Sequence, residues 1–155
     1  MRLRLIVAAI IVSSAALMAL GGCQRIKTTL GLGDRIATPD PGTPEAVIQD
    51  VLKAARTKDE ADGWEAFSNL LHSRELSSPA AMNEWQTMLY PTIRRKVDLL
   101  LEDRSALIYR LMDKREDGKE VKIFVKNSQS DVPTPCTLRQ DPERGNAWRV
   151  FSACF

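Results

Sequence analysis

The 155-residue sequence is poor in the residues that most often carry out chemistry. It has one His, His72, and three Cys, and aromatic residues make up 6% of the chain. The Cys residues form no CxxC pair, and with a single His they make a poor set of zinc ligands. The sequence also has no Walker loop, HExxH motif or GxSxG motif. We therefore assign no catalytic, cofactor-binding or metal-binding residue from motifs.

A surplus of charge of one sign is also missing. The chain carries 22 Lys and Arg against 20 Asp and Glu. Arg2 and Arg4 precede Cys23 and no acidic residue does, so the chain from Cys23 onward holds 20 of each sign. Binding to nucleic acid or to an anionic lipid surface relies on a basic surplus. We expect neither nucleic acid as the main partner nor a polybasic attachment to a membrane.

The only long hydrophobic run lies at the N-terminus. A basic head, Met1–Arg4, precedes the apolar stretch Leu5–Leu20, which two Ser residues interrupt, and Gly21-Gly22 follows. These are the three parts of an export signal. A retained membrane span is the alternative, but a span needs about 20 apolar residues and this run has 16. We predict that residues 1–22 are a signal peptide.

The end of this segment carries a recognisable motif. Leu20-Gly21-Gly22-Cys23 has an aliphatic residue, two small residues and a Cys, and it resembles the lipobox of bacterial lipoproteins. The resemblance implies a diacylglyceryl group on the Cys23 sulfur, cleavage before Cys23 and acylation of the new amino terminus. Two or more acyl chains make membrane anchoring stable. The alternative is an ordinary signal peptide and a soluble protein with a spare Cys.

The residue after the lipobox bears on the destination. In lipoproteins of Gram-negative bacteria, Asp after the lipidated Cys commonly signals retention in the inner membrane. Here the residue is Gln24, so the resemblance implies an outer-membrane lipoprotein that faces the periplasm. A Gram-positive source stays open at this point.

Two cysteines remain if Cys23 carries lipid. Exported proteins mature in an oxidising compartment, where two remaining thiols tend to pair. We therefore predict a disulfide between Cys136 and Cys154, with two buried free thiols as the alternative.

The local pattern supports this pairing. Residues 132–140 and 147–155 are predicted to be strands of one hairpin. If Glu143 faces the first residue of the second strand, a three-residue loop joins them and Cys136 lies opposite Cys154. Opposed strand positions have Cβ atoms about 4.5–5.5 Å apart, which is close enough to bridge after adjustment.

The mature chain divides into a tether and one domain. Residues 23–42 are predicted to be the lipidated Cys and a flexible tether, because Gly31–Pro41 holds two Gly and two Pro and no sustained apolar period. About 20 flexible residues span roughly 25 Å. A single domain then covers residues 43–155.

Helices are expected first in this domain. Thr43-Pro44-Glu45 suits a helix start, with a cap, a Pro at the first position and an acid near the positive end of the dipole. Apolar spacing predicts further helices, and Pro91 should break or kink one of them. The predicted helices cover residues 43–55, 61–72, 78–89 and 93–101.

After Arg104 the apolar period changes from helical to alternating. Residues 107–112 and 121–125 are predicted to be strands, and Asp117-Gly118 between them is a hairpin signal. With the Cys136 and Cys154 strands, the sequence predicts an α+β fold in which helices cover one face of an antiparallel sheet of about four strands.

This order has a second resemblance. An N-terminal helix that opens with Thr43-Pro44-Glu45-Ala46, further helices and a last strand with Trp148-Arg149-Val150 resemble the NTF2-like families, whose sheet is curved into a cone. The resemblance covers residues 43–155. It implies a pocket between helices and sheet, and in some members an enzyme that uses a buried Asp, Tyr or His.

Large apolar residues are the candidates for lining such a pocket. We select Trp64, Trp85, Tyr109 and Trp148, and an apolar ligand such as an acyl chain would suit their walls. The alternative is an ordinary packed core. The lone His72 could act as a general base, although near a helix end it more often caps the helix or meets solvent.

The sequence also contains a run of three consecutive basic residues. Arg94-Arg95-Lys96 could grip a phosphate or a lipid headgroup. Three consecutive helical residues spread over most of the helix circumference, so a solvated face is the simpler interpretation.

Two functions follow from these observations. The first is a non-enzymatic binding or accessory module of the cell envelope, anchored to the membrane through lipid on Cys23, which binds an envelope protein or a small apolar ligand. The second is an NTF2-like enzyme that acts on a small periplasmic substrate. A deep cavity with converging titratable groups would favour the enzyme, and a filled core with an exposed apolar patch would favour a protein partner.

Overall fold

The computed structural model describes residues 33–155. The predicted signal peptide, the lipobox at Cys23 and most of the predicted tether lie outside the described residues. Within residues 33–155, no helix has the length and apolar character needed to cross a bilayer.

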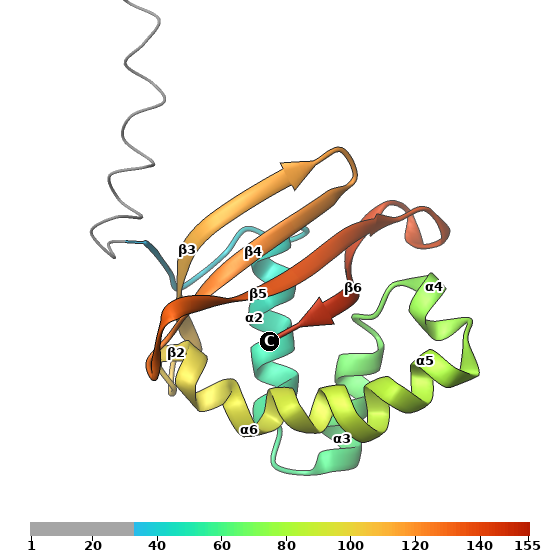
Figure 1. Ribbon diagram of the computed structural model, residues 1–155, viewed down its shortest axis with the longest axis horizontal. Helices are drawn as coiled ribbons and strands as arrows, with labels where there is room; N and C mark the ends of the chain where they lie inside the picture. The colour runs from blue at the N-terminus through green and yellow to red at the C-terminus, as the bar shows by residue number, and fades with distance from the viewer. Residues whose placement is uncertain (1–32) are drawn as a thin grey trace, which may run out of the picture. The chain divides into compact units, whose positions relative to one another are not determined.

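Helices gather on one side of an antiparallel sheet (Figure 1). The α+β class is therefore as expected, but the sheet has six strands where about four were predicted. The additional strands β1 and β2 have three residues each, which is too short to show an alternating pattern in the sequence. The elements in chain order are β1 (Asp34–Ile36), α2 (Pro44–Arg56), α3 (Glu60–Ser68), α4 (Ser73–Leu76), α5 (Pro79–Glu84), the π-helical turn η1 (Trp85–Leu89), α6 (Tyr90–Leu100), β2 (Leu101–Asp103), β3 (Ile108–Asp117), β4 (Glu120–Asn127), β5 (Ser130–Asp141), the 3₁₀ turn η2 (Pro142–Arg144) and β6 (Ala147–Cys154).

The strand order is β1-β3-β4-β5-β6, and β2 also pairs with β3. Strand β1 belongs to the segment that was expected to be tether, and its residue Ile36 pairs with Tyr109 of β3. The predicted hairpin between β3 and β4 is present, with Gly118 at the first position of a two-residue turn and φ of +59°. A left-handed first position is where such a turn needs Gly.

Local capping signals predicted the helix starts correctly. The Thr43 hydroxyl accepts a hydrogen bond from the Ala46 N–H at the start of α2, and Ser78 does the same for Ala81 at the start of α5. These bonds satisfy backbone donors that a first helical turn leaves unpaired.

Two helix predictions were wrong in detail. The helix expected to reach His72 ends at Ser68, and His72 instead precedes the short helix α4. Pro91 was expected to break or kink a helix, and no break occurs there, because α5, η1 and α6 follow one another directly. The Tyr90 N–H bonds to the Trp85 carbonyl five residues back, so a π-helical turn lies directly before Pro91, which supplies no N–H of its own.

The core lies between the helices and the facing side of the sheet. On β4, Val121, Ile123 and Val125 are buried and alternate with more exposed neighbours. They belong to one buried cluster with Ile48 and Leu52 of α2. The side chains of alternate strand positions define two faces, which we name the inner face, towards α2 and α6, and the outer face.

The β5–β6 hairpin brings the two described cysteines together by an unexpected route. Its loop begins earlier than predicted, because Asp141 rather than Glu143 faces Ala147. That shift of register is undone further along, where residues 151–153 of β6 lie opposite a single residue of β5 and Ser152 has φ of +64°. Cys136 therefore still faces Cys154, with an Sγ–Sγ distance of 2.04 Å.

Candidate functional site

The four residues predicted to line a pocket do not come together. Trp64 and Trp85 lie in one aromatic cluster with Phe67 and Tyr90, with ring centroids 4.9–6.0 Å apart. Trp85 is 1% exposed, and its Nε1–H donates to the Glu75 carboxylate at 2.8 Å. This region is packed core, which is the alternative that the sequence left open.

The other two predicted residues lie elsewhere. Tyr109 of β3 is buried, and its hydroxyl donates to the Glu45 carbonyl at 2.9 Å, which holds the start of α2 against the sheet. Burial and the charge of Glu45 raise the pKa of Tyr109 well above its usual value. A hydroxyl that keeps its proton so firmly is a poor acid or base near neutral pH. Trp148 is half-buried on β6 and packs against the core cluster.

His72 is held in a structural setting at the edge of β6. Its backbone N–H donates to the Val150 carbonyl at 2.9 Å, and its Nδ1 accepts from the Arg74 N–H at 3.1 Å. The ring must then carry its neutral-form proton on Nε2, and that atom is buried without a hydrogen-bond partner. A buried Nε2 cannot take a proton from a substrate in this conformation, so the described geometry does not support His72 as a general base.

His72, Ser73 and Asp141 lie together, but their hydrogen bonds are not those of a catalytic triad. The Ser73 hydroxyl donates directly to Asp141 at 2.6 Å, and so does the Ser73 N–H at 2.8 Å. In a triad the Ser proton goes to His, and the His Nδ1–H donates to the carboxylate. Here both connections are absent, because the His72 Nδ1 is an acceptor.

Asp141 instead fixes the loop between β5 and β6. It is 0% exposed and also accepts from the Glu143 N–H at 3.1 Å. Burial raises the pKa of the Asp141 carboxyl, but the hydrogen bonds from Ser73 and Glu143 outweigh burial and leave the pKa below its usual value. The carboxylate is thus charged at neutral pH and fully engaged in holding two segments together.

The basic run of α6 does not converge on one point. Arg94 donates to the Thr57 carbonyl at 2.8 Å and Arg95 to the Thr92 hydroxyl at 2.8 Å. Lys96 lies within 3.4 Å of the Phe155 carbonyl. Each side chain serves a different neighbour, so the run forms no phosphate cradle.

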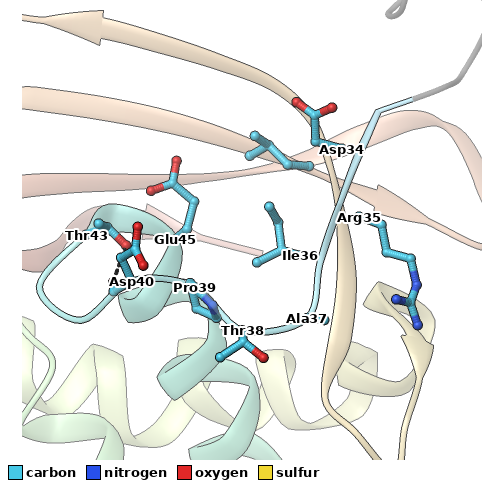
Figure 2. Close-up of a pocket in the computed structure, with 10 residues that line it drawn as sticks. Asp34, Arg35, Ile36, Ala37, Thr38, Pro39, Asp40, Thr43 and Glu45 are labelled. Atoms are coloured by element: carbon cyan, nitrogen blue, oxygen red, sulfur yellow. Dashed lines mark hydrogen bonds between the residues drawn. The ribbon is translucent and has the colours of Figure 1, made fainter.

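A groove of about 540 Å³ lies beside β1 (Figure 2). Its walls come from residues 34–40 and from the start of α2, and Ile36 and Leu111 supply apolar surface. The Glu45 carboxylate lies 3.0 Å from Lys114. Within residues 33–155 no group of three or more His, Cys, Asp or Glu side chains is placed to hold a metal. The groove can offer polar contacts but no converging acid and base.

Two smaller hollows have volumes of about 360 and 340 Å³. The first is lined by residues 99–102 with Lys126 and Ser128, and the second by Ser73, Leu76, Ser77, Glu143 and Arg144. None of the predicted pocket residues Trp64, Trp85, Tyr109 and Trp148 lines the groove or either hollow.

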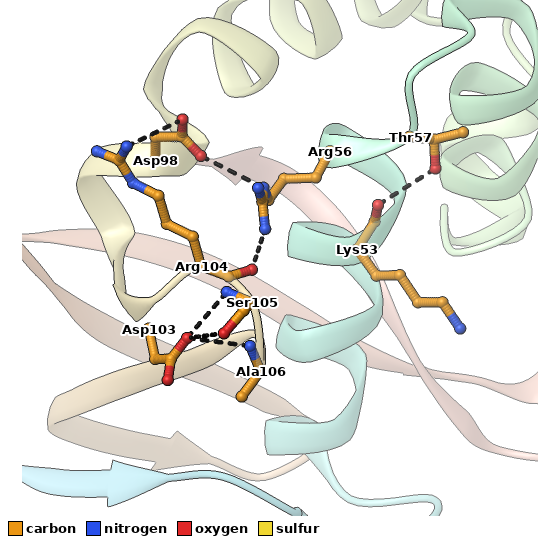
Figure 3. A network of polar contacts seen from close by, with 8 residues as sticks. All are labelled: Lys53, Arg56, Thr57, Asp98, Asp103, Arg104, Ser105 and Ala106. Atoms are coloured by element: carbon orange, nitrogen blue, oxygen red, sulfur yellow. Dashed lines mark hydrogen bonds and ion pairs between the residues drawn. The ribbon is translucent and has the colours of Figure 1, made fainter.

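A polar network joins the ends of α2 and α6 to the β2–β3 turn (Figure 3). Asp98 lies 3.3 Å from Arg56 and 3.8 Å from Arg104, and Arg56 also donates to the Arg104 carbonyl. In the turn, Asp103 accepts from the Ser105 hydroxyl at 2.6 Å and from two backbone N–H groups. The Ser105 hydroxyl and these amides lower the pKa of Asp103. These contacts close a turn and do not form a binding site.

The sequence did not indicate the residues of the groove as a site, and of the residues around Phe151 on the outer face it indicated only His72. The groove residues carried no signal because residues 34–40 form a wall only where β1 pairs with β3, and the residues around Phe151 are distant in the sequence. Comparison of the chain with protein-family models, with curated proteins and with solved structures found no match.

Proposed function

We propose that this protein is a lipid-anchored binding module of the bacterial cell envelope, attached to the outer membrane and facing the periplasm. The observation that carries the proposal is the lipobox pattern Leu20-Gly21-Gly22-Cys23 at the end of an export-signal pattern. The Cys136–Cys154 pair at disulfide distance agrees with an oxidising compartment. Lipid on Cys23 would decide which molecules the domain can meet.

The partner is proposed to be a protein rather than a small apolar ligand. Of the tryptophans that could have lined an apolar cavity, Trp85 is buried in the core, and Trp64 and Trp148 pack against the core from different elements. The groove beside β1 is open and has carboxylates in its walls, including Asp40 and Glu45. Such a surface suits contact with another protein better than burial of an acyl chain.

Among the described residues, the groups that an enzyme would use are engaged in structural bonds. The Tyr109 hydroxyl donates to Glu45, and the Ser73 hydroxyl donates to Asp141. We therefore propose the binding role and advance no reaction.

The NTF2-like cone also remains a proposal for this fold. Its support is the order of elements, in which helices come first and cover one side of an antiparallel sheet that ends in the Trp148-Arg149-Val150 strand. An experimental structure compared with NTF2-like proteins would test it. A flat sheet with no concave face would contradict it.

The test of the function is fractionation of cells that make the protein and its variants. Cys23→Ser removes the lipid acceptor, and we expect the protein to leave the membrane pellet and appear in the soluble periplasmic fraction. The matched control is the double variant Cys136→Ala/Cys154→Ala, which loses two Cys but keeps Cys23 and should stay with the membrane. A Cys23→Ser protein that stays in the pellet as fully as the control would refute lipid anchoring.

A second fractionation tests whether the protein goes to the outer membrane. Separation of inner and outer membranes on a density gradient should place the unaltered protein with the outer membrane, and Gln24→Asp should move it to the inner membrane. Recovery of the unaltered protein with the inner membrane would contradict the proposed sorting.

A further inference from the structure

Phe151 lies at the centre of a basic cluster on the outer face of the sheet. The Arg139 guanidinium carbon lies 3.8 Å from the centroid of the Phe151 ring, and that of Arg74 lies 5.9 Å away. The His72 ring packs edge-on against Phe151, with centroids 5.4 Å apart. Arg149 faces Arg139 across the β5–β6 ladder. We name these five residues the Phe151 cluster.

Arg149 stands out because its guanidinium has no acceptor. Its Nε is buried without a hydrogen-bond partner, and among the described residues no ion pair is formed by this side chain. Burial and the nearby Arg144 both lower the pKa of Arg149, although Asp141 and Asp50 oppose them. A buried donor without a hydrogen-bond partner costs stability, and the half-buried guanidinium is in no ion pair within residues 33–155, so it is available to an acceptor outside the domain.

The neighbouring carboxylates Asp141, Glu120 and Asp50 form no hydrogen bond or ion pair with Arg149, and the first two bond other donors. Asp141 already accepts from the Ser73 hydroxyl and from two backbone N–H groups. Glu120 accepts from Arg139 at 2.6 Å. The Nε2–H of His72 is a second buried donor without an acceptor in the same cluster. The local surplus is therefore one of hydrogen-bond donors and positive charge, although the chain as a whole is nearly neutral.

We infer that the Phe151 cluster docks an acidic segment of a protein partner. A carboxylate of that segment accepts from the Arg149 guanidinium, the exposed Arg74 pairs with a second carboxylate, and Phe151 supplies apolar contact. Arg and aromatic residues are enriched at protein interfaces, and an Arg fork matches a carboxylate in geometry. The inference rests on the proposed binding role and names the chemistry of the partner.

The surroundings favour a peptide over a small anion. The hollow next to the cluster is open, and the Glu143 carboxylate forms part of its wall beside Arg144. A small phosphate in that hollow would gain no contact with Phe151. An extended acidic chain can reach both Arg149 and Arg74 while it covers the aromatic ring.

The test titrates a fluorescent deca-glutamate peptide into the intact protein, extracted in a non-ionic detergent, at low salt. We expect saturable binding and at least a tenfold rise in Kd for Arg149→Gln, since loss of one charged hydrogen-bond partner costs that much or more. The matched control Arg104→Gln removes the same charge from the surface near Asp98 and should change Kd by less than about twofold.

Three outcomes would overturn the inference. One is no saturable binding of the peptide. Another is equal weakening by Arg149→Gln and Arg104→Gln, which would mean attraction by general charge. The third is inorganic phosphate that binds more tightly than the peptide and is lost in Arg149→Gln, which would mean a small-anion site.

A second measurement separates binding from folding. Arg149→Leu removes a half-buried cation whose Nε–H is buried without a partner, so its melting temperature should be equal to or about 3 °C above that of the unaltered protein. A large drop would mean that Arg149 supports the fold and would contradict the inference. Because the peptide is added in solution, its binding does not depend on lipid at Cys23, and failure of the fractionation test would leave this result in place.

Discussion

The two faces of the sheet are built from the same strands but carry opposite kinds of contact. On β4, Ile123 is 0% exposed on the inner face and belongs to the core cluster. Its neighbour Phe124 is half-buried on the outer face, and the Arg115 guanidinium carbon lies 4.8 Å from its ring centroid. On the same face, the Arg139 guanidinium likewise lies over the Phe151 ring.

This contrast separates what folds the domain from what the domain can offer to a partner. Helices α2 and α6 cover the inner face, so its apolar side chains already pack against other residues of the domain. The outer face keeps aromatic rings and guanidinium groups near solvent, and at Arg149 it keeps a buried donor unpaired. We therefore expect inner-face substitutions to act on stability and outer-face substitutions near Phe151 to act on binding.

The largest effect is expected from Ile123→Ala. Loss of a fully buried aliphatic side chain leaves a cavity and should lower the free energy of unfolding by about 2–5 kcal/mol. The matched substitution Phe124→Ala removes a larger side chain from the outer face and should cost less than about 1.5 kcal/mol, because the ring is only half-buried. Urea unfolding followed by circular dichroism measures both. Equal costs would break the distinction between the two faces.

The next largest effect is expected from the disulfide that joins β5 to the end of β6. The Cys136–Cys154 bond closes a loop with a sequence separation of 18, which should contribute about 3 kcal/mol by limiting the unfolded chain. The double variant Cys136→Ala/Cys154→Ala should lose that amount in urea unfolding under oxidising conditions. Under a strong reductant the two proteins should have similar stabilities. A difference that persists unchanged in reductant would show that packing, not the cross-link, is responsible.

A smaller and pH-dependent effect is expected at Asp141, which supports the loop beside the Phe151 cluster. Its pKa lies below the ordinary value of 3.8, so the charged form stabilises the fold above that pH. This contribution should be complete at neutral pH and should be lost as the pH falls below about 4 through the folded-state pKa.

The substitution Asp141→Asn tests this sign. At pH 7 it should cost about 2 kcal/mol, because the charged acceptor of three hydrogen bonds is replaced. Unfolding in urea at pH 7, 5, 4 and 3 should show that the cost shrinks with acid. A cost that grows as the pH falls would contradict the assignment.

The smallest effect is expected from Arg115→Ala on the outer face. Its ion pair with Asp113 spans 2.9 Å, but the Arg115 side chain is 71% exposed. Exposed pairs contribute little, so the free energy of unfolding should change by no more than about 0.5 kcal/mol. A loss above 1.5 kcal/mol in the same urea experiment would mean that the outer face contributes to folding far more than its exposure indicates.

Much of this fold could be predicted because its signals are local. Thr43 and Ser78 each cap a helix within three residues, and the turn at Gly118 joins neighbouring strands. The α+β class follows from the change of apolar period along the chain. The pairing of Cys136 with Cys154 was predicted from a loop that was too short, and it holds only because the bulge at Ser152 restores the register.

The rest could not be predicted because it depends on distant contacts. The three-residue strands β1 and β2 exist only as partners of β3. The segment at His72 leaves its expected helix to pair with Val150, far along the chain. The unpaired Arg149 is visible only when the positions of Asp141 and Glu120 are known, since the sequence alone offers it many carboxylates.

The proposed location in the envelope depends on lipid at Cys23, and the mass of the N-terminal peptide tests this lipid most directly. Protein purified from its native membrane should yield, after proteolysis, a peptide that begins at Cys23 and carries the added mass of a diacylglyceryl group. A peptide that begins at any other residue, or an unmodified Cys23, would contradict the proposed function.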